Sequence, residues 1–167
     1  FNPAWAAKSL AEYLNSQFLK DMTFQHVRER ELSGEIPRLL INTTLYNDGR
    51  RFVMTTLPHE QTQYDLLKDV SRSVGASPRG KDSVELMKVK WASLQSVTPQ
   101  ALNLDLCAIQ LSGAVTASMS FPPVIGPFTF KLEGEERYWH VGDGGLSDNM
   151  GLESLATVAL NALQQKT

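Results

Sequence analysis

Apolar residues recur at intervals of three and four residues, the spacing of one helix face, in four stretches of the chain. The helices that this spacing predicts cover residues 3–20, 84–94, 106–118 and 149–165. A capping residue and a first-turn proline, Asn2 and Pro3, open the first helix, and Asp148 is the expected N-cap of the last. The apolar residues of the last helix share one face, which is typical of an amphipathic helix.

The strand candidates fall between these helices. The strands that we expect cover residues 38–45, 52–54, 128–132 and 138–141. The first contains the run Leu39-Leu40-Ile41, which suggests a central strand buried on both faces. The turn residues Asn47-Asp48-Gly49 lead from it into the returning second strand, and Gly134 joins the last two.

Helices and strands therefore alternate along the chain, and polar, irregular sequence is expected at 28–35 and 58–82. This alternation favours an α/β layered fold, with a central, mostly parallel sheet flanked by helices. In such open sheets, ligands bind in the crevice beyond the carboxyl ends of the strands. A chain of 167 residues is long enough for one domain with its own core and too short for two.

Composition narrows the classes of partner. The formal net charge of −2 offers no basic face for nucleic acid, whereas a lipid or neutral ester is compatible with it. The single cysteine, Cys107, excludes an internal disulfide framework and leaves the compartment open. No apolar run has the length of a membrane-spanning helix, and Phe1 opens directly into helix-like sequence without a signal-peptide pattern.

The densest chemical signal is the run Gly142-Asp143-Gly144-Gly145, expected between a strand that ends at Val141 and a helix that begins near Asp148. The flanking glycines leave the carboxylate uncrowded and permit left-handed backbone angles. The amino end of the following helix favours an ionised carboxylate. An exposed Asp143 held in this way can orient or deprotonate a nucleophile. The alternative is a plain turn in which Asp143 accepts hydrogen bonds from backbone amides.

Three segments carry a family resemblance. Residues 143–149 read Asp-Gly-Gly, followed by an asparagine at the start of a helix. Residues 40–52 contain an Asn-x-Thr core and a glycine turn, and residues 114–123 form an alanine- and serine-rich helix that ends in a proline loop. In this order, across residues 40–152, the segments resemble the patatin-like phospholipase family.

The resemblance implies a lipid acyl hydrolase that uses a serine–aspartate dyad on an α/β sheet. Asp143 would then be the catalytic aspartate, the Gly142-Asp143-Gly144-Gly145 run the active-site loop, and Asn149 a structural residue. The implied substrate is a lipid or phospholipid ester, with possible contact to a membrane surface and with neither cofactor nor metal. Many family members have a proline where this chain has Gly151, a difference from which we expect little consequence.

The nucleophile itself is absent from the chain. No Gly-x-Ser-x-Gly elbow and no glycine-rich oxyanion loop occur, and in the family both lie upstream of the matched segments. We therefore expect residues 1–167 to be the C-terminal part of such a domain, without its N-terminal part. A serine hydrolase that lacks both its serine and its oxyanion donors should be inactive on its own.

Other interpretations stay open. The chain could belong to a non-catalytic relative that binds lipid or scaffolds a membrane complex, or it could be an isolated interaction fragment. A Ser-His-Asp triad through His140 is disfavoured, because the family uses no histidine and because residues 140 and 143 need not face each other. A metal site of His140, Asp143 and Asp148 matches no ligand spacing. The apolar segment 121–128 could line an acyl groove or simply cover the core.

Overall fold

The computed structural model describes residues 3–64, 95–122, 124–131, 134, 136 and 138–165, with side chains from Ala6 onward. The predicted helix at 84–94 and most of the predicted irregular stretch at 58–82 lie outside these residues. No helix within the described ranges is both long and apolar enough to cross a membrane.

The first helix forms as its periodicity predicts. α1 (Pro3–Leu14) continues into a π-helical segment, η1 (Asn15–Leu19). It ends because Lys20 and Asp21 both adopt positive φ, at 44° and 62°. The side-chain amide of Asn15 donates to Oδ1 of Asp21 over 2.6 Å and holds this left-handed turn in place.

The expected loop at 28–35 is wrong, because α2 (Phe24–Leu32) occupies most of it. Thr23 and the imidazole of His26 form a reciprocal capping box at its amino end. Only Phe24, Val27 and Glu31 of this helix are buried, so most of its residues are polar and its sequence resembles a loop.

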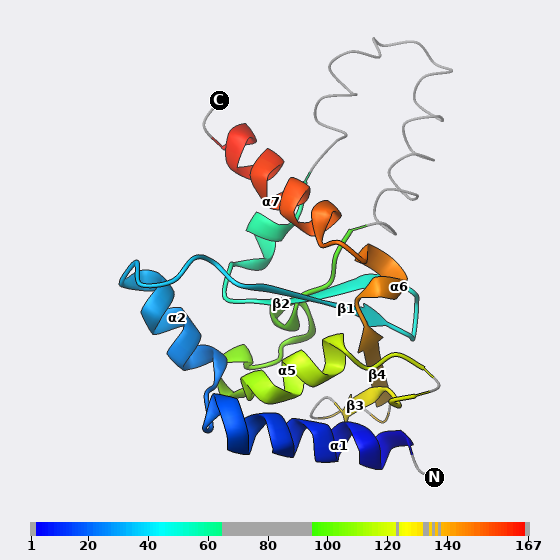
Figure 1. Ribbon diagram of the computed structural model, residues 1–167. Helices are drawn as coiled ribbons and strands as arrows, with labels where there is room; N and C mark the ends of the chain where they lie inside the picture. The colour runs from blue at the N-terminus through cyan, green and yellow to red at the C-terminus, as the bar shows by residue number, and fades with distance from the viewer. Residues whose placement is uncertain are drawn as a thin grey trace, which may run out of the picture.

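The sheet has four strands in the order β2-β1-β4-β3: β1 (Leu40–Leu45), β2 (Arg51–Thr55), β3 (Phe128–Lys131) and β4 (Tyr138–Asp143). Every pair of neighbouring strands is antiparallel (Figure 1). The predicted central, mostly parallel sheet is therefore wrong, and the fold is α/β only in the loose sense that helices pack on a small antiparallel sheet.

The strand connections explain this difference. Parallel neighbours require a crossover of a dozen or more residues, whereas a short turn can join only antiparallel ones. Both turns expected from the sequence are present, with Gly49 at φ 77° between β1 and β2 and Gly134 at φ 80° between β3 and β4. Each turn closes an antiparallel hairpin, and the two hairpins join where residues 43–45 of β1 pair with residues 141–143 of β4.

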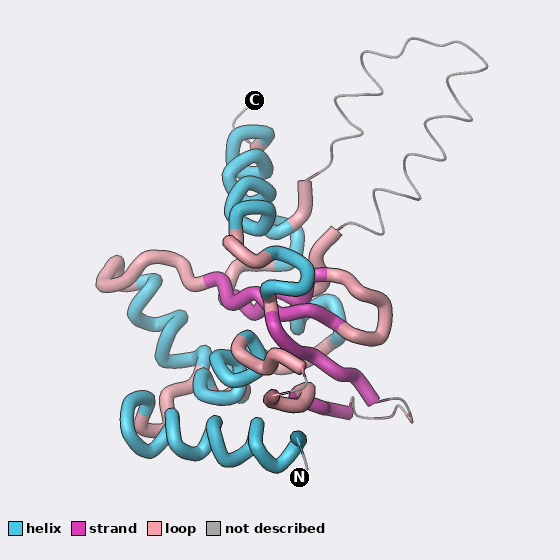
Figure 2. Tube along the Cα trace, turned by 45° about the vertical axis from the view of Figure 1, so that its right-hand side comes forward, coloured by secondary structure: helices cyan, strands magenta, loops and turns pink. Residues whose placement is uncertain are grey.

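Helices cover both faces of the sheet. In Figures 1 and 2, α5 (Leu111–Ser118) lies below the strands with α1 beneath it, while α6 (Gly145–Asp148) and α7 (Leu152–Gln164) lie above. The predicted helix at 106–118 is shorter than expected, because a separate 3-10 turn, η4 (Leu106–Ala108), precedes α5. Two further 3-10 turns are η2 (His59–Thr62) and η3 (Pro99–Leu102). The core cluster consists of Phe24, Val27, Leu45, Phe52, Met54, Val97, Leu106, Leu111, Ala114, Ala117 and Val141.

The last helix packs on the domain with its polar residues. Ser154 is its only buried residue, and the amide of Asn161 donates to the backbone carbonyls of Glu60 and Gln63. The apolar face is exposed instead of packed, with 58% of Leu155 and 63% of Leu163 accessible. The apolar periodicity thus predicts the helix correctly, but it does not predict which face of the helix packs on the domain.

Candidate functional site

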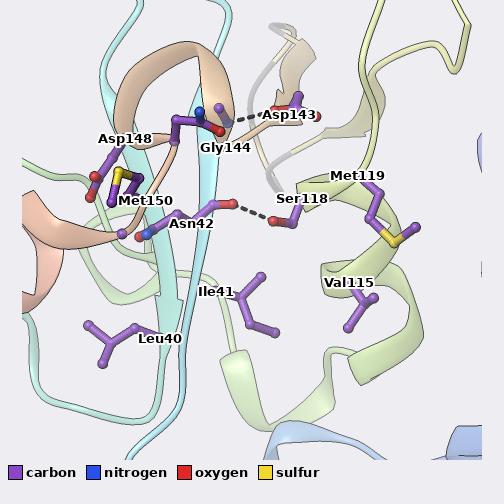
Figure 3. Close-up of a pocket in the computed structure, with 13 residues that line it drawn as sticks. Leu40, Ile41, Asn42, Val115, Ser118, Met119, Asp143, Gly144, Asp148 and Met150 are labelled. Carbon is purple, nitrogen blue, oxygen red and sulfur yellow. Dashed lines mark hydrogen bonds between the residues drawn. The ribbon is translucent and has the colours of Figure 1, made fainter.

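A groove of 720 Å³ opens where β4 leaves β1, between α5 and the turn from α6 to α7. Its polar lining consists of Asn42, Ser118, Asp143, Asp148 and Asn149. Its apolar lining consists of Leu40, Ile41, Val115, Met119 and Met150 (Figure 3). The expected active-site loop therefore borders a sizeable groove.

Asp143 is the last residue of β4, whereas the sequence predicted that this strand would end at Val141. Three contacts fix its position. Its backbone amide donates to the carbonyl of Ser120 over 3.0 Å, and its own carbonyl accepts from Oγ1 of Thr44 over 2.7 Å. Its Oδ1 accepts the amide of Gly145 over 2.6 Å. The half-buried carboxylate is thus held at the groove wall, and only Oδ1 has a hydrogen bond among the described contacts.

The glycines around Asp143 are needed for space and not for unusual backbone angles. None of the three has positive φ, so the left-handed angles that glycine permits are not adopted here. A Cβ on Gly142 would lie 2.0 Å from the hydroxyl of Tyr46, and one on Gly144 would lie 2.4 Å from the carbonyl oxygen of Asn42. These close approaches pack the loop against β1 and explain why side chains are excluded there.

Tyr46 is a neighbour of Asp143 that sequence reasoning missed. Its hydroxyl donates to the carbonyl of Ser120 over 3.3 Å. Burial raises the pKa of Tyr46, and the negative charge of Asp143 raises it further, while a hydrogen bond with the Asp143 backbone partly opposes both effects. Tyr46 therefore stays neutral near physiological pH. The clue in the sequence was Gly142, since a glycine within a strand often marks a close approach by another group.

Asn42 joins three elements at the floor of the groove. Its backbone carbonyl accepts the hydroxyl of Ser118 over 2.7 Å (Figure 3). Its Oδ1 accepts the hydroxyl of Ser154 over 2.8 Å, and that hydroxyl in turn accepts from Nη1 of Arg51 at 3.4 Å. This chain of donors fixes the orientation of the Asn42 amide and leaves Nδ2 next to Gly151, where a Cβ would lie 3.0 Å from it. The Ser118 hydroxyl therefore donates to β1 and not to the Asp143 carboxylate.

The predicted N-cap is wrong, because Gly151 is the N-cap residue of α7, but the Asp148 side chain still caps the first turn from three residues upstream. Its carboxylate accepts the amides of Glu153 and Ser154 over 3.3 and 2.9 Å, and Nη1 of Arg51 lies 3.8 Å from it. Burial raises the pKa of Asp148, but these hydrogen bonds and the Arg51 charge outweigh burial and leave the pKa below its usual value.

Gly151 makes this capping possible, because it adopts φ 68° between α6 and α7. A proline cannot take that angle, so the expectation that the glycine matters little is wrong.

The other candidates from the sequence are His140, Asn149 and a metal site. His140 lies in β4, and its Nδ1 is 2.9 Å from Oγ1 of Thr129. Because residues three apart in a strand point to opposite faces, His140 does not join Asp143 in a triad. Asn149 is exposed at the groove, and no hydrogen bond of its side chain within the described part of the chain supports a structural role. No group of three His, Cys, Asp or Glu residues in that part could hold a metal ion.

Comparisons with protein families, with curated proteins and with solved structures found no match. The resemblance to patatin-like phospholipases accordingly stays a prediction from the motifs.

Proposed function

We propose that this chain supplies the aspartate of a serine–aspartate dyad in a lipid acyl hydrolase, with the serine provided by a segment that the chain does not contain. The observation that carries the proposal is the position of Asp143. Its carboxylate ends a strand at the wall of the 720 Å³ groove, anchored through Oδ1 by the Gly145 amide. A carboxylate that is both anchored and accessible can accept a proton from an approaching hydroxyl.

Part of the β1 edge could pair with a strand from such a segment. β4 pairs with β1 only at residues 43–45, so residues 40–42 extend past the end of β4. Among the described residues, no strand pairs with that part of β1 on the β4 side. Because Ser118 already donates to the Asn42 carbonyl, an added strand would pair at residues 40–41 and would bring its residues to the groove that Asp143 also lines.

The groove lining supports a lipid ester as substrate. Leu40, Ile41, Val115, Met119 and Met150 form an apolar wall next to a single accessible carboxylate. An apolar side of a groove can hold an acyl chain, while the polar side, formed by Asn42, Ser118, Asp143, Asp148 and Asn149, would face the ester group. Methionine adapts to chains of different shape, and two of these five residues are methionines.

The proposed reaction has two steps. The serine oxygen attacks the ester carbonyl while its proton passes to Asp143, and the ester C–O bond breaks as the leaving alcohol takes that proton. Water then attacks the carbonyl carbon of the acyl-serine while its proton passes to Asp143. The bond between that carbon and the serine oxygen breaks, the serine oxygen takes the proton from Asp143, and the fatty acid is released. The oxyanion donors belong to the same absent segment.

The test is hydrolysis of p-nitrophenyl butyrate by the full-length natural protein, together with serine labelling by a fluorophosphonate. Asp143→Asn should lower kcat by about 10³-fold or more at unchanged thermal stability, because the amide oxygen can still accept from Gly145. Asp48→Asn, the same change in an exposed turn, is the matched control. Full activity of Asp143→Asn would overturn the assignment. Lipid binding without turnover or labelling would favour a non-catalytic relative instead.

A further inference from the structure

The groove beside Asp143 is lined by negative and neutral residues only. Asp143 and Asp148 carry carboxylates, and no lysine, arginine or histidine is among the described residues that line it (Figure 3). Burial raises the pKa of Asp148, but its hydrogen bonds and the Arg51 charge outweigh burial, so this carboxyl group is ionised at neutral pH. The described lining is therefore electrostatically unfavourable for a negatively charged ligand.

The cation that contacts this wall, Arg51, is not available to a ligand. Its side chain is only 10% exposed, and it is not among the residues that line the groove. Its Nη1 lies 3.8 Å from Oδ2 of Asp148, and its Nε lies 3.7 Å from Oε2 of Glu153. One guanidinium thus faces two carboxylates, and the three groups together remain negative.

The donor that the groove offers is a neutral amide. Asn42 lines the groove, and its Oδ1 accepts the hydroxyl of Ser154 over 2.8 Å, so Nδ2 is the end of the amide that stays free. In the described part of the chain, Oγ1 of Thr116 is the one buried side-chain nitrogen or oxygen without a hydrogen-bond partner. Nδ2 of Asn42 is therefore reached by solvent and can donate to an oxygen of a ligand.

We infer that the Asp143 groove accepts esters with an uncharged head group and excludes those that carry a phosphate. The acyl chain of such a substrate lies on the apolar side, and Nδ2 of Asn42 donates to a hydroxyl or carbonyl oxygen of the head group. A phosphate would instead bring a charge of about −1.5 to −2 next to two carboxylates. The described lining supplies no arginine or lysine to pair with it.

This inference rests on the proposed hydrolase function and narrows its substrate from lipid esters in general to neutral ones. The experiment compares 1-octanoylglycerol with 1-octanoylglycerol 3-phosphate as substrates of the full-length natural protein at neutral pH. We expect kcat/KM to favour the neutral ester about tenfold or more in about 0.01 M salt. The preference should shrink in about 0.15 M salt, because the screening length falls from about 30 to about 8 Å while the size of the phosphate is unchanged.

Two lysine variants test the charge of the lining, compared in about 0.1 M salt. Asn149 is exposed at the groove, so Asn149→Lys places an ammonium group there and should reduce the preference about threefold or more. Ala162→Lys adds the same charge at an exposed position of α7. It lies roughly 16 Å along the helix from Gly151, beyond the screening length of about 10 Å, and should leave the preference unchanged.

A third variant tests the neutral donor. Asn42→Asp keeps an oxygen that can accept the Ser154 hydroxyl but removes Nδ2. It should raise KM for the neutral ester about threefold or more, because a hydrogen bond to the bound head group is lost. An unchanged KM would contradict the contact between Asn42 and the head group.

The outcomes separate the inference from the proposed function. Equal kcat/KM for the two esters, a preference for the phosphate ester, or a preference that neither salt nor Asn149→Lys alters would overturn the inference and leave the hydrolase standing. Turnover of neither ester by the folded protein would overturn both.

Discussion

The hydroxyl of Thr44 donates a hydrogen bond to the backbone carbonyl of Asp143, with 2.7 Å between the oxygens. Its neighbour Thr43 makes an equivalent bond on the other face of β1, from Oγ1 to the carbonyl of Phe52 over 2.8 Å. Both threonines are buried. They can therefore be compared directly, because only Thr44 contacts Asp143.

Valine at Thr44 should cost more stability than valine at Thr43. Thr43→Val removes the bond to Phe52, whereas Thr44→Val removes the bond to Asp143 and also the contact with Oγ of Ser147 at 3.0 Å. Each lost hydrogen bond costs about 0.5–1.5 kcal/mol in urea unfolding. If Asp143 acts in ester hydrolysis, Thr44→Val should lower kcat about tenfold, while Thr43→Val should leave it close to wild type. Equal losses of kcat in the two variants would show that Thr44 acts only through stability.

Gly142 and Tyr46 should be energetically coupled. Gly142→Ala places a methyl group 2.0 Å from the present position of the Tyr46 hydroxyl, so the ring must move, at a cost of about 1–3 kcal/mol. In a Tyr46→Ala background the same substitution should cost much less, because the obstructing ring is gone. A double-mutant cycle in urea measures this coupling, and strictly additive free energies would contradict the contact.

Asp148 should make stability depend on pH. Asp148→Asn removes the charge that caps α7 and faces Arg51, and we expect a loss of about 1–3 kcal/mol at neutral pH. The pKa of Asp148 is lower in the folded chain than its ordinary value of 3.8. Its contribution is therefore complete above that value and is lost as the pH falls through the folded pKa.

Urea unfolding of wild type and Asp148→Asn at several pH values gives the measurement. The difference between the two proteins should stay constant from neutral pH down to the ordinary pKa and should shrink only below it. A difference that vanishes well above that range would mean that the carboxylate is not stabilised as an anion in the folded state.

Gly151 should tolerate neither alanine nor proline. At φ 68°, alanine costs about 1–2 kcal/mol from backbone strain alone. Its Cβ would also lie 3.0 Å from Nδ2 of Asn42, a contact tighter than usual. Proline cannot reach this angle and should cost about 3 kcal/mol or more. Denaturation midpoints in urea test the order glycine, alanine, proline, and a proline variant as stable as wild type would contradict the backbone geometry.

Local signals in the sequence predicted much of the fold. Glycines at both turns placed the two hairpins, because a positive φ is a property of a few adjacent residues. The run around Asp143 was recognised because several glycines close together leave the carboxylate without neighbouring side chains. α2 was missed because a helix that buries only three residues has little apolar periodicity.

Sequence alone determined the existence of α1, α5 and α7, both glycine turns and the glycines that flank Asp143, because these depend on residues close together in the chain. Only the tertiary structure decided that residues 43–45 pair antiparallel with residues 141–143, that Tyr46 requires Gly142, and that α7 exposes its apolar face. Those outcomes join segments far apart in the sequence, and periodicity within one segment carries no information about which distant surface will meet it.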